Sequence, residues 1–108
     1  YTIRTLLRSV PAAVAGINFL SGGLSEEAAS VYLNEMNAAP DLPWNVSFSY
    51  GRALQHSAIR AWGGSDIEAG QKFVLARAKA NSEASIGCYV ADSQPSSDEK
   101  LFVAGYSY

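Results

Sequence analysis

The sequence predicts an α/β fold in which buried parallel strands alternate with helices. Two short apolar runs, at residues 14–20 and 45–50, are typical of strands, and a helical pattern of apolar residues follows each of them. The first run is almost continuously apolar rather than alternating, which is typical of a parallel strand covered on both faces. Strands that alternate with helices along the chain belong to the α/β class.

Composition and charge are those of an ordinary globular protein. The chain has 108 residues, of which 48% are hydrophobic and 17% charged, with a net charge of −2. The absence of a basic stripe argues against a nucleic-acid partner, and no apolar run reaches the roughly 18 residues that a membrane helix needs. Cys88 is the only cysteine, so the chain has no internal disulfide, and a reducing compartment is expected rather than secretion.

The chain opens on a helical pattern. Apolar residues recur at helical spacing, at Ile3, Leu6, Leu7 and Val10. Pro11 ends this helix, and Val14–Leu20 then forms the first strand. Nothing resembling a cap precedes Ile3, so we expect the chain to begin inside an element of a longer protein.

A second helix links the two strands. It opens at Ser25-Glu26-Glu27, where the helix dipole favours acidic side chains, and Pro40 and Pro43 end it. Its expected buried stripe is Ala29, Leu33 and Met36, with Tyr32 alongside. Trp44 leads into the second strand, Asn45–Tyr50. Strand, helix and strand with short connections form a βαβ unit, so the strands are expected to be parallel neighbours.

Two more helices follow the second strand. The first begins at Arg52 and ends at Gly63-Gly64, with Leu54, Ala58 and Trp62 on one side. The second is expected to open with a capping box, Ser65-x-x-Glu68, and to run to about Ser85. Its expected buried face is Phe73, Ala76, Ala80 and Ala84, whereas Lys72, Arg77 and Lys79 are expected to face water. Gly87 is a plausible left-handed terminator.

This element order fits one part of a larger barrel. Two parallel strands covered on both faces cannot form a self-sufficient sheet, and an eight-stranded α/β barrel needs about 250 residues. The sequence therefore predicts the C-terminal part of a (β/α)8 TIM barrel, with its last two strands and flanking helices. Residues 1–88 are assigned to the barrel, and residues 89–108 to a polar, mobile C-terminal tail.

The loops that end the two strands form the best candidate site. Ser21-Gly22-Gly23 follows the first strand, and Ser49-Tyr50-Gly51-Arg52 follows the second. Small hydroxyl and glycine residues before a helix expose backbone N–H groups to an anion, and an arginine adds a positive fork. Because both loops lie at the carboxyl edge of parallel strands, the sequence predicts one phosphate site. Most Ser-Gly-Gly triplets are turns only, and Gly63-Gly64-Ser65, which follows a helix, is interpreted in that way.

Other reactive side chains carry weaker signals. His56 lies inside a helix with no second histidine in the chain, and Cys88 lacks a partner at metal or nucleophile spacing. Glu26 and Glu27 are adjacent on a helix and point in different directions, so a first-turn role explains them better than paired catalysis. No lysine follows a strand in an apolar pocket, so Lys72, Lys79 and Lys100 are not Schiff-base candidates. We expect no metal, no cofactor, and no nucleophile or general base in this segment.

Several motifs together closely resemble the class I fructose-bisphosphate aldolases. They are FLSGG, PWNVSFSYGRALQ, AWGG, RAKANS and the terminal Tyr108, and the resemblance covers essentially the whole chain. It implies a homotetrameric enzyme that reversibly cleaves fructose 1,6-bisphosphate to dihydroxyacetone phosphate and glyceraldehyde 3-phosphate through a Schiff base. The family's Schiff-base lysine and acid/base carboxylates would precede Tyr1. A cytoplasmic location is expected, with plastid and glycosome as alternatives.

The resemblance also implies roles for individual residues. Phosphate binding falls on Ser21, Gly22, Gly23, Ser49 and Arg52, and Tyr108 of the mobile tail would assist proton transfer. Leu24 stands where a glutamine is common in the family, and some members have alanine in place of Gly51. An alternative is a catalytically incomplete, aldolase-like chain that serves as a structural or binding component of an assembly. An intact mass of roughly three times 11.5 kDa would favour the enzyme.

Overall fold

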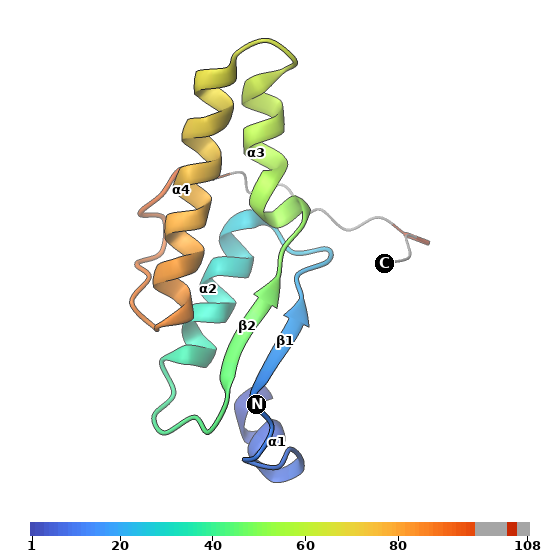
Figure 1. The fold of residues 1–108 in the computed structure, drawn as a ribbon, viewed down its shortest axis with the longest axis vertical. Helices are drawn as coiled ribbons and strands as arrows, with labels where there is room; N and C mark the ends of the chain where they lie inside the picture. Colours follow the sequence, from blue (N-terminus) through green and yellow to red (C-terminus); the bar gives the residue numbers. More distant parts are fainter. Residues whose placement is uncertain (97–103, 106–108) are drawn as a thin grey trace.

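The computed structural model describes residues 1–96 together with Ala104 and Gly105. Helices and strands follow one another in the order that the sequence predicts, and Figure 1 shows them along the chain. They are α1 (Thr2–Ser9), β1 (Gly16–Leu20), α2 (Glu26–Asn37), β2 (Asn45–Ser49), α3 (Arg52–Trp62) and α4 (Ile67–Ser85).

The two strands are parallel neighbours, which confirms the predicted βαβ unit. Gly16 pairs with Asn45 at one end of the sheet and Leu20 with Ser49 at the other. Both strands therefore end at the same edge, where α2 and α3 begin (Figure 1). The apolar run had led us to expect that both faces of β1 are covered. The described residues leave part of the strand exposed, and Leu20 is 64% exposed. The covering layers are not supplied by the part of the chain that the structure describes.

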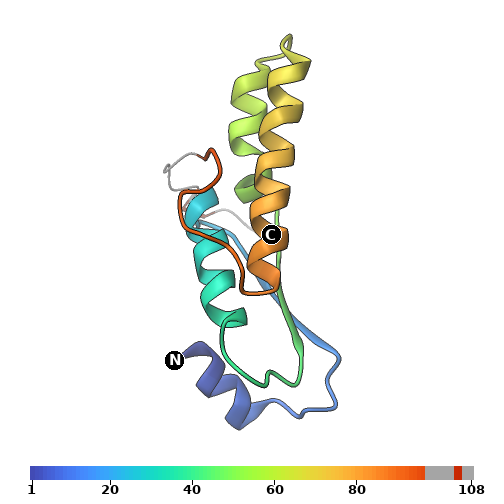
Figure 2. The same cartoon turned by 90° about the vertical axis from the view of Figure 1, so that its left-hand side faces the viewer.

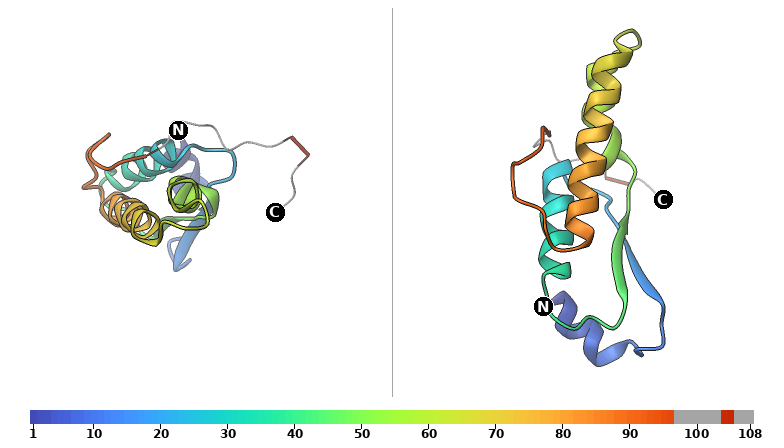
Figure 3. Two further views of the ribbon diagram at one scale, coloured as in Figure 1. Left: turned by 90° about the horizontal axis from the view of Figure 1, so that it is seen from above. Right: turned by 60° about the vertical axis from the view of Figure 1, so that its left-hand side comes forward.

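Helix α2 and the C-terminal part of α4 lie beside the strands, α3 lies beyond the strands' C-terminal ends, and α1 lies beyond their N-terminal ends (Figures 2 and 3). The core lies where α2 packs against α4 and β2, and its buried members are Leu33, Trp44, Val46, Ala80, Ala84 and Tyr89. Two hydrogen bonds tie neighbouring segments to this core. The indole Nε1 of Trp44 donates to the carbonyl of Pro11 at 2.9 Å, and Nδ2 of Asn37 donates to the carbonyl of Val46 at 3.1 Å.

Helices α3 and α4 form a hairpin that rises above the sheet (Figure 1). Gly63 ends α3 in the left-handed region with φ 53°, as the glycine pair predicts. The predicted capping box is wrong by one residue, because Asp66 and not Ser65 is the N-cap of α4. The Asp66 carboxylate accepts from the amide of Ala69 at 3.1 Å, and a carboxylate competes well for a free first-turn N–H.

The segment after α4 packs against α2. Gly87 has φ 74°, which confirms its left-handed conformation. Tyr89 is 6% exposed, and its amide donates to Oδ1 of Asn34 at 2.8 Å. The tail that the sequence predicts from residue 89 onward thus begins with a residue that packs against α2, because an aromatic ring gains by burial in the core. The mobility of the tail stays a prediction.

Candidate phosphate site

A pocket of about 160 Å³ lies at the carboxyl ends of both strands. It is several times larger than the roughly 30 Å³ that one water molecule occupies. Both strand-ending loops contribute to its wall, and every phosphate-binding candidate found in the described part of the sequence lines it. The lining residues are Leu20, Ser21, Gly22, Gly23, Ser49, Tyr50, Gly51, Arg52 and Ala53. The structure therefore brings Ser21, Gly22, Gly23, Ser49 and Arg52 together.

The first loop is fixed to the second by Ser21. The Ser21 hydroxyl donates to the carbonyl of Ser49 at 2.9 Å, and the Ser21 amide donates to the same oxygen at 3.3 Å. Gly23 has φ 82°, a backbone conformation that side chains disfavour, so a glycine is required at this point of the turn. The loop is therefore tight and joined to its neighbour at the strand ends.

Two helices begin at the pocket. Ser25 caps α2, with its hydroxyl accepting from the amide of Ala28 at 3.1 Å. Gly51 is the N-cap of α3 and has no side chain to cap it, and Arg52 is the first residue of that helix. The positive end of α3 and the guanidinium group beside it favour an anion in the pocket. A Cβ at Gly51 would meet nothing within 4 Å, so the pocket does not require a glycine at this position.

Tyr50 forms part of the pocket wall and stays neutral. Its ring packs against Phe48 with the centroids 5.9 Å apart, and its hydroxyl is buried without a hydrogen-bond partner among the described residues. Desolvation of the phenolate raises the pKa of Tyr50 to about 12, despite the opposing charge of Arg77. Tyr50 is therefore suited to shaping the pocket and unsuited to proton transfer near neutral pH.

Behind the pocket lies a buried polar cluster that the sequence patterns did not reveal. Glu26 and Glu27, the first two residues of α2, have different hydrogen-bond partners. The Glu26 carboxylate accepts from the amide of Ser57 at 3.2 Å and from its hydroxyl. The Glu27 carboxylate accepts from the Tyr89 hydroxyl at 2.6 Å and from the Asp92 amide at 2.7 Å. Their different directions are confirmed, but a first-turn dipole role alone does not explain these contacts.

Arg77 is the cation of this cluster, and the expectation that it faces water is wrong. Its side chain is 0% exposed and donates to the carbonyl of Glu26 at 2.9 Å, to Glu27 at 3.4 Å and to the hydroxyl of Ser30. Arg77 lies three residues before Ala80 and seven before Ala84, on the buried stripe of α4. A cation on an apolar stripe is the sequence signal that indicates a buried partner.

The remaining candidates lie away from the pocket or outside the described residues. His56 is half-buried on α3, and Cys88, Lys72 and Lys79 are exposed. Tyr108 and Lys100 lie outside the residues that the structure describes. Within residues 1–96, 104 and 105, no group of three or more His, Cys, Asp or Glu side chains could hold a metal ion. No helix in the same part of the chain is both long and apolar enough to span a membrane.

Comparison with known proteins identifies the family. A family model described as "Glycolytic: Fructose-bisphosphate aldolase class-I" matches residues 1–108. The chain belongs to the class I fructose-bisphosphate aldolases. The resemblance that the motifs predict is thus confirmed, and the fold matches part of a TIM-barrel family.

Similar proteins of known function come from an animal and from plants. The chain is 53% identical to fructose-bisphosphate aldolase of Drosophila melanogaster, over 99% of this chain and 30% of the relative. It is 51% identical to chloroplastic aldolase 1 of Pisum sativum and to cytosolic aldolase 4 of Arabidopsis thaliana, over 100% of this chain and 31% and 29% of those proteins. The chain thus spans about 30% of the length of these relatives.

A solved structure with a similar fold is that of fructose-bisphosphate aldolase from Plasmodium falciparum, in complex with TRAP and a small-molecule inhibitor. It matches with a TM-score of 0.78 and 50% identity, over 82% of this chain and 26% of that chain.

Proposed function

We propose that this chain is the C-terminal part of a class I fructose-bisphosphate aldolase and supplies its substrate-phosphate pocket. β1 and β2 would be the last two strands of the eight-stranded barrel. The rest of the enzyme would supply the Schiff-base lysine and the acid/base carboxylates, and complete the homotetramer. The reaction would be the reversible cleavage of fructose 1,6-bisphosphate to dihydroxyacetone phosphate and glyceraldehyde 3-phosphate.

One observation carries this proposal: the strand-ending loops converge on one pocket at the carboxyl edge of the sheet. In α/β barrels this edge holds the active site, and the loops after strands seven and eight often bind phosphate. Gly22 and Gly23 would offer amide donors to one phosphate group, and Ser49 a hydroxyl. Ser21 lines the same pocket, and its hydroxyl would turn from the Ser49 carbonyl to the phosphate when the ligand binds. Arg52 would supply the positive charge that the chain's net charge of −2 does not provide.

Substitution of Arg52 in the full-length enzyme tests the proposal. A hydrogen bond to a charged group contributes about 1.5–3 kcal/mol, so Arg52→Ala is expected to weaken binding of the sugar bisphosphate about 10- to 150-fold. Arg52→Lys is expected to recover only part of this loss, because lysine cannot form the two-nitrogen fork. Unchanged affinity in Arg52→Ala would remove Arg52 from the site.

Tyr108 would assist proton exchange at the Schiff-base intermediate. Tyr108→Phe in the full-length enzyme is expected to slow fructose 1,6-bisphosphate cleavage and proton exchange strongly, while the melting temperature stays unchanged. Normal turnover in this variant would exclude a catalytic role for the tail.

A further inference from the structure

The two phosphate loops are joined at the strand ends and again behind the pocket. The first contact is the pair of hydrogen bonds from Ser21 to the Ser49 carbonyl. The second is the contact between Glu26, at the start of α2, and Ser57, which lies five residues after Arg52 on α3. A single contact leaves two elements free to pivot about it, whereas two separated contacts fix the angle between them. The contact between Glu26 and Ser57 therefore fixes the angle between α2 and α3.

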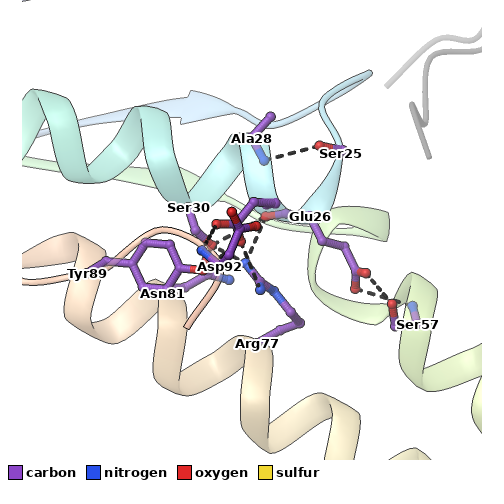
Figure 4. Close-up of polar contacts among 10 residues, drawn as sticks. Ser25, Glu26, Ala28, Ser30, Ser57, Arg77, Asn81, Tyr89 and Asp92 are labelled. Carbon is purple, nitrogen blue, oxygen red and sulfur yellow. Dashed lines mark hydrogen bonds and ion pairs between the residues drawn. The ribbon is translucent and has the colours of Figure 1, made fainter. Parts of the chain in front are cut away.

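Glu26 is held on both sides. Its side chain is 1% exposed and reaches α3, while its backbone carbonyl accepts from Arg77 of α4 at 2.9 Å. Figure 4 shows the Glu26 side chain directed toward Ser57 and away from Arg77. A buried carboxylate needs donors to offset its desolvation, so this contact resists displacement more than a surface contact would.

We propose that Glu26 and Ser57 are positioning residues for the phosphate pocket. Their contact fixes α2 against α3 and so holds the Ser21–Gly23 loop in position opposite Arg52 in the pocket wall. This inference rests on the proposed phosphate site, although neither residue lines the pocket. Binding groups lose much of their effect when they are displaced by about 1 Å, so a change at this contact reaches the ligand through the loop positions.

Charge-conserving variants of the full-length enzyme test the proposal, with inorganic phosphate as the probe. Glu26→Asp keeps the charge but shortens the side chain, which withdraws the carboxylate from Ser57. We expect the dissociation constant of phosphate, measured by phosphorus NMR titration, to rise about tenfold. Glu27→Asp is the matched control, because Glu27 contacts Arg77, Tyr89 and Asp92 rather than α3. This control is expected to leave phosphate affinity unchanged.

Ser57→Ala is the milder variant and keeps the test decisive if Glu26→Asp fails to fold. It is expected to weaken phosphate binding, and Ser57→Thr, which retains the hydroxyl, to restore it. A lowered melting temperature with unchanged phosphate affinity in Glu26→Asp and Ser57→Ala would overturn the positioning role.

Arg52→Ala separates the phosphate site from the positioning role. If Arg52→Ala weakens phosphate binding while the Glu26 and Ser57 variants do not, only the positioning role fails. If Arg52→Ala also has no effect, the phosphate site itself is wrong and the inference fails with it.

Discussion

Substitution of Arg77 tests whether the buried cluster stabilises the fold. Arg77→Met in the full-length enzyme keeps much of the side-chain volume but removes the donors to Glu26, Glu27 and Ser30. The Glu27 carboxylate would then remain buried with Tyr89 and Asp92 as partners but without a cation.

Loss of one member of a buried ion pair costs about 3–5 kcal/mol. At about 2 °C per kcal/mol for a large domain, the melting temperature is expected to fall by at least about 6 °C.

Thermal unfolding monitored by circular dichroism measures this effect, with Lys79→Met as the matched control. Lys79 is exposed on the same helix, two residues after Arg77, so its substitution is expected to change stability by less than about 0.5 kcal/mol. Arg77→Lys keeps the charge but loses the fork and is expected to lie between wild type and Arg77→Met. Equal melting temperatures for Arg77→Met and Lys79→Met would refute the reasoning that the cluster stabilises the fold.

Three further predictions concern stability. Burial raises the pKa of Tyr50 from 10.0 to about 12, so between these pH values the folded state keeps a proton that the unfolded state loses. The free energy of unfolding is therefore unaffected by this group below pH 10 and falls as the pH rises toward 12. Tyr50→Phe should flatten this loss in urea titrations across that pH range, and an unchanged slope would contradict the assigned cause. Gly87→Ala should destabilise the enzyme by more than about 1 kcal/mol, because φ is +74° and the added Cβ would lie 2.9 Å from the Asn37 carbonyl oxygen. Gly51→Ala is the control and should leave the urea midpoint nearly unchanged, because its Cβ would meet nothing within 4 Å. The isolated segment 1–108 should show no fixed near-UV circular dichroism, since Leu20 and other apolar side chains are exposed; a cooperative melt would refute this.

Local patterns predicted the elements, and the parallel order of the two strands then predicted the pocket. The βαβ unit follows from two apolar runs and a short helix, and parallel strands must place their terminal loops at one edge. Ser21 and Arg52 could therefore be predicted to meet without any knowledge of side-chain contacts.

The polar cluster could not be predicted in this way, because its members come from distant parts of the chain. Arg77 and Glu27 are separated by 50 residues, and Tyr89 and Glu27 by 62. Helical periodicity assigns a charged residue to water unless a partner is known, and only the packing of α2 on α4 supplies that partner. The Ser65 cap failed for a local reason, since Asp66 offers a stronger acceptor one residue later.

Among the described residues, those that line the candidate phosphate pocket all lie between residues 20 and 53. Contacts between residues close in the chain cost less loop-closure entropy and form sooner than distant ones. Ser21 and Ser49 are only 28 residues apart, so we expect the pocket to assemble early, with the β1–β2 pair and α2. Arg77 would join α2 later in folding. The pocket wall would thus exist before Arg77 completes the buried polar cluster beside it.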